Sequence, residues 1–236
     1  MPSLSRHLVV AALLAAAATL QAQPLDYDHQ ESWKSALDRA QSPIDIKSAT
    51  AHAGDAREPQ RIQILNPRAE MKVVDNGHAI EVETEGPRAI IRGRHFKLAQ
   101  FHFHASSEHT IDGQFFPLEG HFVFRAANGR LAVIGVMFKE GAANTLVSKI
   151  LDRVGGEKHL TASIATLLPR NMAYYHYLGS LTTPPLTENV EWYVLRHPVT
   201  LSSAQLEAFK ARYSHNNRAI QPLNDRPLIA YPGKKR

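Results

Sequence analysis

The order of polar and apolar residues along the chain predicts a protein built mainly from short β-strands. Residues 100–104, Gln-Phe-His-Phe-His, and residues 118–124, Leu-Glu-Gly-His-Phe-Val-Phe, alternate with a period of two, which is typical of strands. Further strands are expected at 61–65, 72–74, 79–83, 89–91, 96–104 and 191–195, and the continuous apolar run at 131–138 favours a central buried strand. Asn76-Gly77 is a hairpin signal between two of these segments.

Helical patterns are fewer and shorter. Residues 144–154 have helical spacing and stop at Gly155-Gly156, and a serine at 202 or 203 can cap a helix that runs to Tyr213. Residues 162–168 are a third, short candidate. The remaining segments are a polar stretch at 23–40, a turn leading into a strand at 41–46, and loops at 49–60 and 216–232. The pattern therefore favours a mainly β (α+β) protein with a few peripheral helices.

The first 22 residues have the features of a secretory signal peptide. Arg6 and His7 give a short positive region, and residues 8–20 are an uninterrupted run of apolar and small residues that is too short to span a membrane. We therefore expect cleavage after Ala22, a mature domain at 23–236 and a location in the periplasm, with secretion as the alternative. An uncleaved membrane anchor is the competing interpretation.

Composition and charge narrow the classes of function. Removal of residues 1–22 takes away Arg6 and no acidic residue, so the formal net charge changes from +5 to +4. The excess is mild and scattered, so we expect no nucleic acid partner and no stable membrane anchor, while a homodimer is allowed. The mature length fits one domain with a sizeable core, and the absence of cysteine means that an exported protein of this sequence contains no disulfide.

Histidines on two of the predicted strands suggest a metal site. His102 and His104 lie two residues apart and therefore on one face of a strand, and a turn at Asp112-Gly113 would bring His121 beside them. Three neutral histidines with an open fourth position are the ligand set of a catalytic zinc site, whereas structural zinc sites usually contain cysteine. The competing interpretation is a pair of exposed strand histidines. A metalloprotease would show His-Glu-x-x-His on a helix, and the chain has no such motif.

Each of these strands also carries a polar residue that could orient its histidine. Gln100 precedes His102 by two residues, and Glu119 precedes His121 by two residues, so each pair shares a face. Metal-bound histidines usually donate their second ring N–H to such a fixed acceptor. These two residues strengthen the prediction of a metal site.

Several motifs resemble those of the α-class carbonic anhydrases, and the matches run in order from about residue 27 to 228. They are Gln-Ser-Pro-Ile-Asp-Ile at 41–46, Asn-Gly-His at 76–78, Gln-Phe-His-Phe-His at 100–104, Ser-Glu-His-Thr-Ile-Asp-Gly at 107–113, Glu-Gly-His at 119–121, Ser-Leu-Thr-Thr-Pro-Pro at 180–185, and Asn-Arg at 217–218 with Gln-Pro-Leu at 221–223. The short link at 104–108 is similar to the bacterial, exported members. The resemblance implies a single domain on a large twisted, mostly antiparallel β-sheet.

The resemblance also implies a mechanism. Zn²⁺ held by His102, His104 and His121 would supply zinc-bound hydroxide for the reversible hydration of carbon dioxide to bicarbonate and a proton. Gln100, Glu119 and the carbonyl of Asn216 would orient the ligands, and His109 would be a buried partner of Glu119. Thr182 would bind the hydroxide and donate its own proton to Glu108. Taken alone, Glu108 is equally well a surface acid and Thr182 a turn hydroxyl.

Further positions follow from the same resemblance. An apolar substrate pocket would be lined by Val123, Val133, Leu181, Thr182, Thr183, Val190 and Trp192, all of which except the two threonines are equally well core residues. His78 would carry the product proton to buffer, since a histidine titrates near pH 6.5; its plain alternative is a hairpin histidine.

The chain departs from the family pattern at several points. Leu186 stands where many exported bacterial members have a disulfide cysteine, which puts the stability of the Thr182 loop in doubt. Glu81 stands where the family often has an amide, and its charge is expected to raise the pKa of His78. The amino-terminal segment is shorter than usual.

Two further functions remain in view. A non-catalytic binding module on the same fold is the rival hypothesis, and the presence of all three histidines with Glu108 and Thr182 speaks against it. Esterase activity is a plausible side reaction, because the same nucleophile attacks activated esters.

Overall fold

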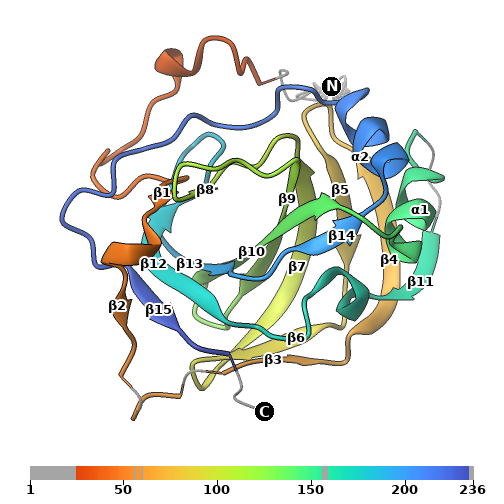
Figure 1. Ribbon diagram of the computed structural model, residues 1–236. Coiled ribbons are helices and arrows are strands. Elements are labelled where there is room, and N and C mark those ends of the chain that lie inside the picture. Colours follow the sequence, from red (N-terminus) through yellow and green to blue (C-terminus); the bar gives the residue numbers. More distant parts are fainter. Residues whose placement is uncertain (1–24, 56, 60, 156–158, 234–236) are drawn as a thin grey trace, which may run out of the picture.

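The computed structural model describes residues 25–55, 57–59, 61–155 and 159–233, and one large twisted sheet dominates it (Figure 1). The expected signal peptide at 1–22 and its cleavage site lie outside the described residues. Within them, no helix is long and apolar enough to cross a membrane.

The sheet is assembled from both long and very short strands. They are β2 (His52–Ala53), β3 (Ile62–Leu65), β4 (Arg68–Asp75), β5 (Ile80–Thr84), β6 (Arg88–Ile91), β7 (Arg94–His104), β9 (Leu118–Arg125), β10 (Leu131–Glu140), β11 (His159–Ser163), β12 (Tyr174–Ser180), β13 (Glu188–Leu195), β14 (Val199–Leu201) and β15 (Ile229–Tyr231). A separate parallel pair joins β1 (Asp45–Ile46) and β8 (Thr110–Ile111). The α-helices are α1 (Thr145–Leu151) and α2 (Ser203–Lys210), and short 3₁₀ helices occupy Gln30–Ser32, Ser48–Thr50 and Ile164–Leu167.

The strand order is β11-β4-β5-β7-β9-β10-β13-β12-β15-β2, with β6 beside β7 and β3, and β14 beside β10. Strands β10 and β13, β10 and β14, and β15 and β2 run parallel, and the other neighbours are antiparallel. This arrangement confirms the mainly β class and the mostly antiparallel sheet expected from the sequence. Strands β7, β9 and β10 lie side by side near the centre of the sheet, and each pairs with a neighbour on both sides, which fixes its register.

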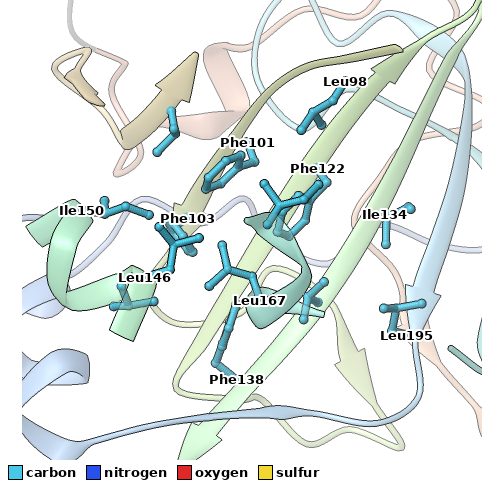
Figure 2. Close-up of a cluster of buried hydrophobic side chains, with 14 of the residues drawn as sticks. Leu98, Phe101, Phe103, Phe122, Ile134, Phe138, Leu146, Ile150, Leu167 and Leu195 are labelled. Atoms are coloured by element: carbon cyan, nitrogen blue, oxygen red, sulfur yellow. The ribbon is translucent and has the colours of Figure 1, made fainter. Parts of the chain in front are cut away.

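The apolar face of the central strands packs against the helices. Phe101 on β7 stacks on Phe122 on β9 with ring centroids 5.0 Å apart, and both side chains are buried. Leu146 and Ile150 of α1 cover this layer (Figure 2). Burial of each such large side chain stabilises the fold by roughly 1.5–3 kcal/mol. The opposite face of β7 and β9 is thereby left for the polar residues of the alternating pattern.

Both α-helices begin at the caps that the sequence indicates. The Asn144 side chain accepts hydrogen bonds from the main-chain N–H groups of Leu146 and Val147. Ser202 and Gln205 form a reciprocal capping box at the start of α2. The helices end earlier than expected, at Leu151 and Lys210, because the following residues form turns.

Three sequence predictions need correction. The helix expected at 162–168 is wrong, since Ala162 and Ser163 end β11 and only Ile164–Leu167 coil into a 3₁₀ helix. Strand β12 was not anticipated, although it pairs along its length with β13. The expected loops at 49–60 and 216–232 each contain a short strand, β2 and β15, and these two pair with each other. In each case pairing with another strand, rather than the local sequence pattern, decides the conformation.

Candidate metal centre

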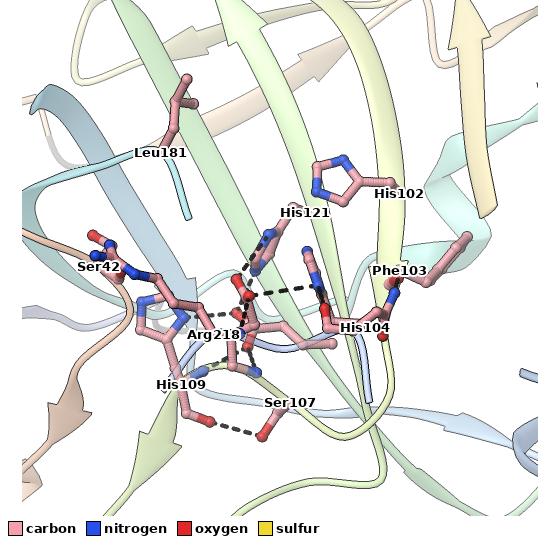
Figure 3. Close-up of polar contacts among 12 residues, drawn as sticks. Ser42, His102, Phe103, His104, Ser107, His109, His121, Leu181 and Arg218 are labelled. Carbon is pink, nitrogen blue, oxygen red and sulfur yellow. Dashed lines mark hydrogen bonds and ion pairs between the residues drawn. The ribbon is translucent and has the colours of Figure 1, made fainter. Parts of the chain in front are cut away.

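The three predicted ligand histidines meet on one face of the central sheet. Strands β7 and β9 are antiparallel, and their register places His102 directly opposite His121. His104 lies one pleat further along β7. One ring nitrogen from each of these three histidines lies within 4.8 Å of the other two (Figure 3). Because directly paired residues share a face, the strand register alone is enough to bring the three rings together.

Each of the three rings has an oxygen atom close to one of its nitrogens. His102 Nδ1 lies 2.8 Å from Gln100 Oε1, and His104 Nδ1 lies 2.5 Å from the main-chain oxygen of Asn216. His121 Nε2 lies 3.0 Å from Glu119 Oε1. The nitrogens left to bind a ligand are therefore Nε2 of His102, Nε2 of His104 and Nδ1 of His121. An acceptor on the far side of a ring fixes its tautomer and its direction.

The electrostatics of the cluster favour neutral imidazoles. Burial lowers the pKa of His104 to about 4 and holds the pKa of His102 well below its usual range. Burial lowers the pKa of His121 as well. Each ring therefore keeps a free lone pair at neutral pH, which is the form that binds metals. His104 Nε2 is buried and has no hydrogen-bond partner among the described residues. A buried nitrogen of this kind, with two more beside it and no cysteine in the chain, fits a zinc ion.

Glu108 and Thr182 lie together beside the histidines. Both side chains are buried, and Glu108 Oε2 lies 3.8 Å from His121 Nδ1. Burial raises the pKa of the Glu108 carboxyl to about 7, while a nearby charge on His121 and a hydrogen bond with the Thr182 side chain act in the opposite direction. The main-chain N–H of Arg218 donates to Glu108 Oε1 at 2.7 Å. The main chain thus fixes one oxygen of the Glu108 carboxyl, while the buried Oε2 has no hydrogen-bond partner among the described residues.

Glu119 is the centre of a buried network behind His121. Its Oε2 accepts hydrogen bonds from the main-chain N–H groups of Glu108 and His109, and its Oε1 lies 2.9 Å from His109 Nδ1. Burial alone would raise the pKa of Glu119, but the adjacent histidines hold it well below its usual range. A carboxylate that is kept charged is a strong acceptor for His121.

The network continues to two residues that were not predicted from the sequence. The Tyr177 hydroxyl lies 2.6 Å from His109 Nε2 and 2.8 Å from Ser42 Oγ. Tyr177 belongs to β12, the strand that the sequence analysis missed, and Ser42 belongs to the Gln-Ser-Pro motif at 41–43. The motif at 41–43 was the available sequence signal for these two residues. Polar side chains that are buried need hydrogen-bond partners. Both nitrogens of His109 are used in this network, so His109 is no free ligand.

Asn216 contacts the site through its side chain as well as its carbonyl. Its Nδ2 donates to the main-chain oxygens of Phe103 (2.9 Å) and His78 (3.0 Å), and its Oδ1 accepts from the N–H of Ala105 (2.9 Å). One buried side chain therefore joins the ligand strand β7 to the turn that carries His78.

His78 lies in the turn between β4 and β5, where Gly77 adopts a left-handed φ of 87°. The imidazole is half-buried. Burial lowers its pKa, and Asp75 acts against that shift. The rise expected from Glu81 is therefore wrong. Glu81 instead accepts a hydrogen bond from Asn76, and burial raises the pKa of Glu81 itself. The carbonyl of His78 accepts from Asn216 Nδ2, and the main-chain oxygen of the same asparagine contacts His104, so this turn lies beside the cluster.

The apolar residues of the expected substrate pocket belong to one cluster beside the histidines. Val133, Val190 and Trp192 are buried in it, and Val123 and Leu181 are partly buried against it. The Trp192 ring lies 4.8 Å from that of His121 between centroids. Thr183 is half-buried in the turn after Thr182, where its carbonyl accepts from the N–H of Leu186 at 3.0 Å.

The loop that carries Thr182 is held without a disulfide. Leu186 is 1% exposed, and its carbonyl accepts a hydrogen bond from Gln41 Nε2. The same Gln41 amide donates to Glu188 at 3.0 Å, and Ser42 and Ser180 exchange hydrogen bonds of 3.0 and 3.1 Å. The motif at 41–43 therefore acts as the anchor of this loop, a role that its sequence position did not reveal.

Comparison with known proteins gives a consistent picture. A model of the eukaryotic-type carbonic anhydrase family matches residues 28–232. The carbonic anhydrase of Pectobacterium carotovorum is 44% identical over 197 residues, which cover 80% of this chain and 79% of that protein, and that of Neisseria gonorrhoeae is 36% identical, with 86% and 85% covered. Among solved structures, the α-carbonic anhydrase of Thermovibrio ammonificans with the inhibitor sulfanilamide superposes with a TM-score of 0.73 at 42% identity (80% of this chain, 86% of that one). That of Photobacterium profundum gives 0.75 at 35% identity (82% and 90%).

Proposed function

Since the chain belongs to the eukaryotic-type carbonic anhydrase family, we propose that His102, His104 and His121 hold a zinc ion, and that this centre hydrates carbon dioxide reversibly to bicarbonate and a proton. The observation that carries the proposal is how the two nitrogens of each ring are used. Each has one nitrogen on a fixed acceptor and the other free toward a common point. Structural histidines have no need of such an arrangement.

The hydration reaction requires a strong oxygen nucleophile at neutral pH. A bound zinc ion supplies this chemistry by lowering the pKa of a water molecule to about 7. The residues around the site would orient this nucleophile. The Thr182 hydroxyl donates to the Glu108 carboxylate, so its own oxygen can only accept from the attacking oxygen, which turns a lone pair of the nucleophile toward the substrate carbon.

Carbon dioxide is apolar and binds best to an apolar surface beside the nucleophile. Val123, Val133 and Val190 offer such a surface, and Leu181 and Trp192 complete it next to His121. Water excluded from this surface cannot compete for the position of the gas.

Each turnover leaves a proton that must reach buffer. We assign this transfer to His78, which is half-buried at the turn after β4, beside the cluster of ligand rings. Its lowered pKa keeps the ring neutral, and therefore ready to accept a proton, to lower pH than an ordinary histidine.

The proposed site of action is the periplasm, with secretion as the alternative. The support is the apolar run at residues 8–20 behind Arg6. Cell fractionation with an antibody to the mature chain, beside a variant that lacks residues 1–22, tests this location. Retention of the full-length chain in the cytoplasm would contradict it.

The deciding experiment is stopped-flow hydration of carbon dioxide by the purified mature protein, with metal content measured in the same sample. Fast hydration that is lost with a zinc-stripping chelator and restored by zinc would support both the reaction and the cofactor. A folded, zinc-loaded protein without hydration would favour the rival function, a binding module on the same fold.

A further inference from the structure

A row of three positive side chains crosses three neighbouring strands at some distance from the metal site. The register pairs Arg88 on β6 with Lys97 on β7, and Lys97 with Arg125 on β9. All three side chains are exposed. No hydrogen bond or ion pair joins any of them to another residue within the described part of the chain.

This row costs folding free energy. Side chains directly opposite each other on paired strands lie about 4.5–5.5 Å apart at Cβ, and like charges in such pairs are destabilising. A charged residue on an edge strand can be explained as protection against aggregation. That explanation fails here, because β7 is an interior strand with β5 and β6 on one side and β9 on the other.

The row borders a pocket of about 430 Å³ without any acidic lining residue. Its apolar surface comes from Ala99, Ala126 and Ala127, with His95 at the side, while the side chains of Phe96 and Leu98 are buried in the hydrophobic core. Pockets of about 300–1,000 Å³ with apolar walls and a few convergent polar groups are the usual form of small-molecule sites.

The row lies on the same face of the sheet as the metal ligands. Every second residue of β9 shares a face, so His121, Val123 and Arg125 lie on the same side of the sheet. Arg125 is about 13 Å along the strand from His121. On β7 the register shifts between Leu98 and Gln100, and this irregularity turns Lys97 to the face of His102 despite their odd spacing. The pocket is therefore separate from the ligand cluster.

We propose that this pocket is a second binding site, for an organic anion with an apolar body. The anionic head would lie on the row of Arg88, Lys97 and Arg125, and the apolar body on the alanine surface. The row spans two strand spacings, about 10 Å, which suits one head group better than a polymer. The charge repulsion within the row is relieved when an anion binds.

Three probes separate the contributions of head and body. Octanoate carries both, acetate only the charge and octanol only the chain. Isothermal titration calorimetry on the zinc-loaded mature protein should show saturable one-site binding for octanoate alone, weakened by added salt because the contact is electrostatic. In ¹⁵N-labelled protein, octanoate should shift the amide signals of Leu98, Ala126 and Ala127.

Matched variants test the row itself. The combined change Arg88→Gln, Lys97→Gln and Arg125→Gln should weaken octanoate binding at least tenfold. The control Lys34→Gln, Lys47→Gln and Lys149→Gln removes the same charge from exposed positions elsewhere and should leave binding unchanged. Equal weakening in both variants, or shifts confined to the amides of Thr182 and Thr183, would overturn the proposal, the second because it places octanoate at the metal centre. None of these readouts depends on hydration activity.

Discussion

Asn216 binds His104 through its main-chain oxygen, 2.5 Å from His104 Nδ1, while its side chain binds the main chain on either side of that ligand. The same side chain also reaches the carbonyl of His78. The ligand strand and the turn of the proposed proton carrier are thus positioned by one amide.

Asn216→Ala should lower zinc affinity while the main-chain oxygen remains. Loss of such outer contacts typically costs about 10–100-fold in metal affinity, and we expect about tenfold, measured by competition with a chromogenic chelator. Asn224→Ala, which removes an exposed amide bonded to Arg39, is the control and should change nothing. An affinity equal to that of the parent would show that the carbonyl alone positions His104.

His78→Ala should slow turnover in weak buffer and leave kcat/KM for carbon dioxide unchanged. Positioned acid–base groups contribute about 10²–10⁴-fold, and because water can partly replace the ring we expect about a tenfold loss. Added imidazole should restore the rate. His29→Ala, at an exposed site, is the control.

The pH dependence of this step carries a definite sign. Burial lowers the pKa of His78, so the proton-accepting neutral form persists below the usual value of about 6.5. Turnover of the parent protein limited by proton transfer should therefore fall only at a pH below about 6.5. A midpoint above that value would contradict the assignment of His78.

Thr182→Ala should reduce kcat/KM by about 100-fold, since the nucleophile loses the group that orients it. Thr182→Ser keeps the hydroxyl and should retain most activity. Metal content, measured on both variants, should equal that of the parent because Thr182 touches no ligand acceptor. An alanine variant as fast as the serine variant would remove Thr182 from the mechanism.

A second buried charge cluster lies away from the metal centre. Glu191 is 2% exposed and accepts hydrogen bonds from Arg94, Arg130 and Tyr193. Burial alone would raise its pKa, but these donors lower it to about 2. Its contribution is therefore complete above the unfolded value of about 4.5 and is lost as the pH falls toward 2.

Glu191→Gln should accordingly cost about 2 kcal/mol of unfolding free energy at pH 7, a figure reduced from the full shift because both arginines are partly exposed. The difference from the parent should shrink between pH 4.5 and 3 in urea titrations. Glu207→Gln, which removes an exposed partner of Lys210, should show no such trend. A pH-independent difference would mean that the carboxylate is not the stabilising form.

Local sequence patterns were sufficient to predict the two strands that carry the ligand histidines. Alternation at 100–104 and 118–124 predicts that His102, His104 and His121 point to one face, and strand pairing places them together. The caps at Asn144 and Ser202 were also readable, because a cap acts on its own helix.

Contacts between distant segments were not readable from local patterns. Strand β12 has no clear alternation, since Tyr174, Tyr175 and Tyr177 are all buried, and its position depends on β13. The register shift in β7 reverses the faces of residues before Ala99, and the sequence gives no signal for it. The pKa of His78 is lowered rather than raised, because burial of the ring outweighs the opposing charge of Asp75.

The anchoring of the Thr182 loop by Gln41, Leu186 and Glu188 has a consequence for the conditions in which the protein can work. Those contacts are hydrogen bonds and burial, and no cysteine exists anywhere in the chain. The loop therefore needs no disulfide oxidase and no disulfide isomerase to reach its working shape. Thiol reductants leave it unchanged, so none of the contacts that hold this loop depends on an oxidising compartment.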